Sequence, residues 1–147
     1  MPYVSRSELT AAVPADLAGQ LLGAGGDAIW TEIEAAVSRE IDGRLAARYT
    51  VPLPEPVPAI VRSAALVLAA EALYQRLNFY GDSNPWTKRA DGIRGTQGQQ
   101  GGQEGLLDRL AAGNPPLYAA AVQAPKRSAA AITEPAVTNS SSGNRLC

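Results

Sequence analysis

The stretch EIDGRLAARYTVPLPEPVP, residues 40–58, decides the fold. Its first half closes a segment with helical periodicity, and its second half places prolines at alternate positions: Pro52, Pro54, Pro56 and Pro58. Proline fixes φ and lacks a backbone N–H, so this spacing excludes a helix and favours an extended, polyproline-like strap. Pro58 precedes a long apolar run, and a helix start tolerates the missing N–H. The sequence therefore predicts two long antiparallel helices joined by a strap.

The first long helix is predicted over residues 27–49, with Asp27 as its cap. Apolar side chains at every fourth position would form its buried face: Ile33, Val37, Ile41 and Leu45. Charged side chains occupy other faces, and Glu40 and Arg44 have the spacing of a surface ion pair within one helix.

The second long helix is predicted over residues 59–80. Only Arg62, Ser63 and Glu71 are polar between residues 59 and 74, so this helix is apolar around most of its circumference. Such a helix must be covered on several sides, and we expect a neighbouring subunit to supply part of the cover. The residues predicted to face that subunit are Val61, Leu66, Leu68 and Leu73.

Short helices complete an all-α prediction. Ser5 and Glu8 match a capping box at the start of one helix, and Asp16 is placed to cap a second. Further short helices are predicted over residues 86–93 and 104–112.

A flexible insertion is predicted over residues 81–104, because its glycine- and glutamine-rich part has too little apolar area to offset the entropy of ordering. It lacks the Gly-Lys-Ser/Thr ending of a phosphate-binding loop. Residues 1–116 would then form a helical domain. Residues 117–147, rich in Ala, Pro, Ser and Thr, would form an extended arm.

Residues that carry chemistry are scarce. The chain has no histidine and a single cysteine, Cys147, which removes the common nucleophile–base pairs and multi-cysteine metal sites. We therefore expect no catalytic, cofactor or metal site, and no enzyme. A net charge of -1 does not match the basic surface of a dedicated DNA-binding protein. No apolar run approaches the roughly 20 residues that cross a bilayer, so we expect no membrane partner.

Several motifs resemble those of the Mu-like phage head-tail adaptor proteins, also described as connector or head-completion proteins. They are Glu-Ile-Asp-Gly-Arg-Leu at residues 40–45, Ala-Arg-Tyr at 47–49, Val-Pro-Leu-Pro at 51–54 and the closing Leu-Leu-Asp-Arg-Leu-Ala-Ala-Gly at 106–113. The similarity covers about residues 3–117. The glycine- and glutamine-rich stretch and the long arm depart from the family pattern.

The resemblance implies a virion protein, made in the host cytoplasm, that forms a homo-oligomeric ring of about twelve subunits at the head-tail neck. The ring would lie below the portal protein, extend the DNA channel and connect the DNA-filled head to a stopper or tail protein. DNA would pass through without specific binding. The loop over residues 82–103 is expected to face the tail side or the channel.

The arm is expected to engage the portal through charged and apolar side chains: Lys126, Arg127, Ile132, Val137, Arg145 and Leu146. Three alternatives remain open at this point, of which an all-helical scaffold or chaperone would be absent from mature particles. Another is a different neck component, such as a stopper or tail-completion protein, although those are usually rich in strands. The last is a small helical DNA-binding regulator, although no helix offers several exposed basic or amide side chains.

Overall fold

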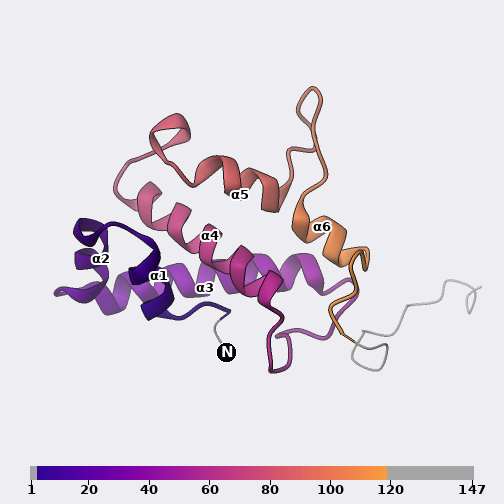
Figure 1. The fold of residues 1–147 in the computed structure, drawn as a ribbon, viewed down its shortest axis with the longest axis horizontal. Coiled ribbons are helices and arrows are strands. Elements are labelled where there is room, and N and C mark those ends of the chain that lie inside the picture. The colour runs from indigo at the N-terminus through magenta and orange to yellow at the C-terminus, as the bar shows by residue number, and fades with distance from the viewer. Residues whose placement is uncertain (1–2, 119–147) are drawn as a thin grey trace, which may run out of the picture.

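The computed structural model describes residues 3–118, which form helices and no β-strand, so the all-α prediction is confirmed (Figure 1). The elements are α1 (Arg6–Ala12), α2 (Ala15–Leu22), α3 (Gly26–Leu45), α4 (Ala59–Arg76), the 3-10 helix η1 (Gly81–Ser83), α5 (Thr87–Arg94) and α6 (Leu106–Ala111).

Helices α3 and α4 form the centre of the fold. Figure 1 shows α4 running back across α3 in the opposite sense and at an incline. The predicted stripe of α3 is buried as expected: Ile33, Val37, Ile41 and Leu45. Half of the buried side chains of α4 are alanines, which allow helix backbones to approach closely: Ala64, Ala65, Ala69 and Ala70.

The shorter helices cover this pair from different directions. Helices α1 and α2 pack at one end, where α2 contacts α3 and α1 contacts α4. Helix α5 packs on α4, and α6 packs on α3 and α5. The capping box at the start of α1 is confirmed, because Ser5 Oγ accepts from the Glu8 N–H and the Glu8 carboxylate accepts from the Ser5 N–H.

Two predicted helix caps are wrong. Helix α2 begins directly after Pro14, so Asp16 lies inside its first turn. Helix α3 begins after Gly25, which has a left-handed backbone conformation, and Asp27 instead pairs with Arg6 of α1. In both places the backbone turn itself fixes the helix start.

Both long helices are also shorter than predicted. Helix α3 ends at Leu45, and the Tyr49 N–H bonds back to the Leu45 carbonyl while the Tyr49 side chain is buried. Helix α4 ends at Arg76, because Asn78 takes a left-handed conformation with φ of 67°. Asparagine tolerates this conformation better than most residues and commonly follows a helix end.

The strap between α3 and α4 is bent, not extended as predicted. It bends at residues 51–52 and 55–56, and the Val51–Pro52 and Glu55–Pro56 peptide bonds are cis. Pro52, Pro54 and Pro56 are exposed, whereas Leu53 between them is buried. Pro58 directly precedes α4, as predicted.

The predicted subunit-facing residues need correction. Val61, Leu68 and Leu73 are fully buried inside the single chain, so they are not available to a second subunit. The cover expected from a neighbour comes from α1, α3 and α5. Of the four residues, Leu66 alone keeps part of its surface exposed.

Candidate interaction surfaces

A buried tyrosine ties the start of the described chain to the strap. The Tyr3 hydroxyl donates to the Asp42 carboxylate on α3 and accepts from the Leu53 N–H at 2.9 Å. Burial, together with the hydrogen bond to Asp42, raises the pKa of Tyr3 well above its ordinary value. The neutral phenol therefore holds the strap against α3.

Two further tyrosines fix the place where the C-terminal arm begins. Tyr49 accepts at its hydroxyl from the Leu117 N–H at 3.1 Å, and Tyr118 donates to the Pro54 carbonyl at 2.8 Å. Their rings meet edge to face at 6.3 Å. The arm thus leaves the helical body beside the strap.

The family-like motif at residues 40–45 connects α3 to three other segments. Its apolar members, Ile41 and Leu45, are in the core. Glu40 binds Arg94 at the end of α5, Asp42 binds Tyr3, and Arg44 binds the first turn of α6. The polar positions of this motif therefore hold the fold together and converge on no reaction centre.

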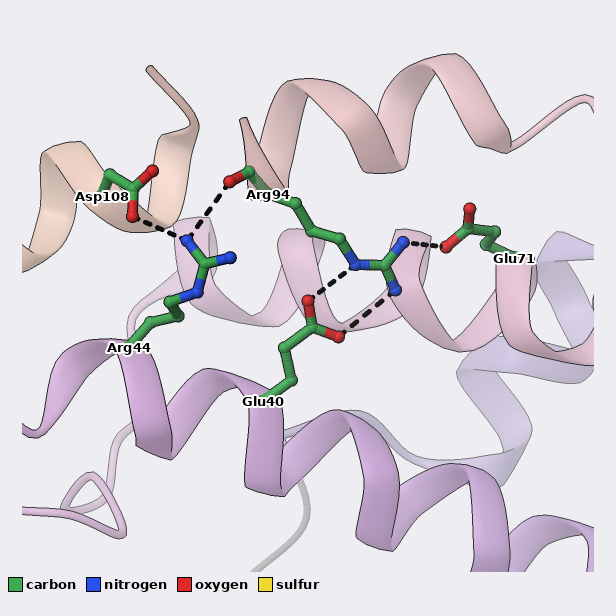
Figure 2. A network of polar contacts seen from close by, with 5 residues as sticks. All are labelled: Glu40, Arg44, Glu71, Arg94 and Asp108. Carbon is green, nitrogen blue, oxygen red and sulfur yellow. Dashed lines mark hydrogen bonds and ion pairs between the residues drawn. The ribbon is translucent and has the colours of Figure 1, made fainter. Parts of the chain in front are cut away.

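The ion network that joins α3, α4, α5 and α6 is the most buried group of charges in the described chain (Figure 2). Arg94 donates to both carboxylate oxygens of Glu40, at 2.6 and 3.2 Å, and to the Glu71 carboxylate on α4. The Glu71 side chain is only 3% exposed. Burial disfavours the charged guanidinium, but the bonds to Glu40 and Glu71 outweigh it and raise the pKa of Arg94.

Arg44 extends this network to the segment between α5 and α6. Its Nη1 atom donates to the Arg94 carbonyl at 3.2 Å and to Asp108 at 2.7 Å, so one guanidinium holds the end of α5 beside the start of α6 (Figure 2). The predicted surface pair of Glu40 with Arg44 on α3 is wrong. Both instead reach partners far along the chain.

Glu71 is the signal in the sequence that could have revealed this network. It is a lone carboxylate in a helix that is otherwise nearly apolar, and a buried charge requires a partner of opposite sign. The sequence does not indicate which arginine supplies it, because Arg94 lies 23 residues away.

A projecting loop, here called the finger (residues 95–105), rises from the point that Arg44 secures (Figure 1). Its base is closed by the Thr96 N–H bonding to the Gln103 carbonyl at 2.8 Å and by the Gln103 N–H bonding to Thr96 Oγ1 at 2.9 Å. The first part of the predicted insertion contains two helices, η1 (Gly81–Ser83) and α5 (Thr87–Arg94), and the finger is the remainder.

Two glycines meet at the foot of the finger. A Cβ atom on Gly105 would lie 2.3 Å from the backbone nitrogen of Gly95, and one on Gly95 would lie 2.7 Å from the nitrogen of Gly105. No other residue type permits this approach of the two backbones. The chain therefore leaves the body and returns to it at nearly one point.

Large apolar side chains are exposed at three positions of residues 3–118. Phe79 and Tyr80, which follow α4, are 43% and 61% exposed, and Leu22 at the end of α2 is 68% exposed. Phe79 packs edge to face on Tyr74, with ring centres 5.9 Å apart. A separate shallow hollow near the other end of α4 is lined by Glu8, Ala59, Arg62, Ser63 and Leu66.

Residues 3–118 contain no cluster of side chains suited to a metal ion. Within the same range, no helix has the length and apolar character needed to cross a membrane.

The six residues predicted to bind the portal, Lys126, Arg127, Ile132, Val137, Arg145 and Leu146, lie outside the described residues.

Comparison with known proteins gives one match. The family model described as "Bacteriophage Mu, Gp36" matches residues 3–133, which include the whole described helical body. No curated protein and no solved structure matches the chain. Because the family model spans most of the sequence, the chain belongs to the bacteriophage Mu Gp36 family.

Proposed function

We propose that this phage protein is a structural component of the virion that forms a ring below the portal and connects the DNA-filled head to the tail. The observation that carries the proposal is the match to the Mu Gp36 family over residues 3–133. The resemblance of its motifs to those of head-tail adaptors supports the more specific position at the neck between head and tail. In this role the protein needs no cofactor and catalyses no reaction.

The distribution of exposed apolar surface supports assembly into a ring. A ring requires a head-to-tail contact between two different patches of the same subunit. Phe79 and Tyr80 lie beyond the last turn of α4, and the hollow that contains Leu66 lies toward its first turns. These two surfaces differ in shape and position, as a head-to-tail contact demands.

The charge of the chain is compatible with a DNA channel. With 13 basic and 14 acidic residues, the subunit lacks the excess of cations that would retain passing DNA. The C-terminal arm, which starts at residue 117 beside the strap, is the segment that we propose to bind the portal. The stopper or tail protein would attach to another part of the ring.

The test is the composition of purified particles. A tagged copy of the protein is expressed in cells that produce particles, and the proteins that co-purify are identified and quantified by mass spectrometry. The proposal predicts portal and tail proteins in constant ratio to the tagged chain. Recovery of DNA or host regulators without virion proteins would refute it.

A further inference from the structure

The finger is an addition to the fold and not a necessary connection. Since the backbones of Gly95 and Gly105 are in contact, a much shorter link could join α5 to α6. The intervening residues bury no large apolar side chain, and residues 97–104 are all exposed. Stability of the helical body therefore does not account for the presence of the finger.

The finger nevertheless has a defined shape. Besides the two bonds between Thr96 and Gln103, the Gln99 N–H bonds to the Thr96 carbonyl at 3.1 Å and the Gly102 N–H bonds to the Gln99 carbonyl at 2.9 Å. A loop with internal bonds loses less entropy on binding than an open coil, so its shape favours recognition.

Ion pairs and hydrogen bonds also hold both ends of the finger against the helical body. Arg44 binds both stems, through the Arg94 carbonyl on one side and Asp108 on the other, and the Arg94 side chain is anchored in turn by Glu40 and Glu71 (Figure 2). Moving either arginine away would leave carboxylates without their partners, among them the buried Glu71, and this cost holds the two stems in place. This network sets the direction in which the finger projects.

The side chains of the finger favour a protein partner over DNA. Between Gly95 and Gly105 the side chains include four glutamines and one threonine, no lysine or arginine, and the single charge of Glu104. Contact with DNA depends mainly on cations that neutralise phosphates, and the finger offers none. Amide side chains donate and accept hydrogen bonds at once, which suits the polar groups of a protein surface.

We propose that the finger is a docking element for a second protein, recognised through hydrogen bonds to its glutamine amides. The inference rests on the proposed function, in which the partner is the stopper or tail protein that joins the ring. Gln97, Gln99 and Gln100 at the tip supply the contacts, and the ion network below them holds the tip in position.

The experiment compares three forms of the protein in cells that produce particles: wild type, the tip variant Gln97→Ala/Gln99→Ala/Gln100→Ala and the control Gln20→Ala. Gln20 is an exposed glutamine on α2, which lies at the other end of the molecule (Figure 1). Incorporation into heads is measured by mass spectrometry and tail attachment by electron microscopy. Circular dichroism confirms that each variant folds.

The tip variant is expected to enter heads as the wild type does and to leave most heads without tails, because the loss of three hydrogen bonds weakens binding about a hundredfold. Tailless particles would then accumulate, while the control would behave as wild type. A second variant, with residues 96–104 replaced by Gly-Ser, should give the same defect without relying on the chosen side chains.

The experiment distinguishes an error in the proposed function from an error in the docking inference. If wild-type protein is absent from particles, the proposed function is wrong and the inference falls with it. If wild-type protein is present and both finger variants attach tails normally, the docking inference alone is overturned. If tails attach but packaging or release of DNA changes, the finger faces DNA, and the docking inference is again overturned.

Discussion

Replacing Arg94 by methionine tests the ion network most directly. The change removes the cation from Glu71, whose side chain is 3% exposed, and from Glu40, which is 27% exposed. Removal of one partner from a buried ion pair costs about 3–5 kcal/mol. Because Arg94 itself is 32% exposed, water partly reaches the site, and we expect a loss near the lower end, about 3 kcal/mol.

The assay is urea unfolding of dilute protein, followed by far-ultraviolet circular dichroism. Fluorescence of the two tryptophans, Trp30 on α3 and Trp86 just before α5, provides a second probe. Coincident transitions would justify a two-state treatment. The matched control is Arg76→Met, because Arg76 pairs with Glu32 on the surface and should cost less than about 1 kcal/mol.

A second substitution shows whether the buried charge causes the loss. Glu71→Gln should destabilise the wild type, where it removes the partner of Arg94. In the Arg94→Met background the same change should increase stability, because it removes an unpaired buried carboxylate. A cost below about 1 kcal/mol for Arg94→Met, or a Glu71→Gln effect of the same sign in both backgrounds, would refute the reasoning.

Three further outcomes follow from the structure. Tyr3→Phe should cost about 1–3 kcal/mol because the Leu53 N–H loses its buried acceptor. Because the pKa of Tyr3 in the folded protein is raised above its ordinary value of 10.0, this stabilisation is complete below pH 10.0 and declines above it, so the difference between wild type and variant in urea unfolding should narrow at alkaline pH. Leu68→Ala should cost about 2–5 kcal/mol in the monomer, measured by urea unfolding, because Leu68 is fully buried; a negligible cost would contradict its core position. Phe79→Ser combined with Tyr80→Ser should leave the helical spectrum unchanged and reduce self-association in sedimentation velocity, whereas unchanged association would exclude this surface from the ring contact.

The long helices were predictable because their signals are local. The four-residue spacing of Ile33 to Leu45 and the apolar run after Pro58 depend only on neighbours in sequence, and the structure forms a helix at each place. The capping box of Ser5 and Glu8 is similarly local. These signals fix the helices without specifying how they pack.

The contacts between distant segments could not be predicted in the same way. Three of the four side chains assigned to a subunit contact proved to be internal, because an apolar helix surface does not reveal whether its own chain or another covers it. Glu40 and Arg44 looked like surface partners, although their true partners lie 54 and 64 residues away. Periodicity shows which face of a helix is apolar, but it does not show which segment or subunit packs against that face.

The contact of Gly95 with Gly105 has a practical consequence for genetics. A segment whose ends coincide can be lengthened at small cost, since each doubling of a loop adds only about 0.6 kcal/mol of closure entropy. A peptide tag inserted between Gln99 and Gln100 should therefore leave the helical body intact. Such an allele would separate folding from attachment, and it would also carry a label for locating this protein in the assembled particle.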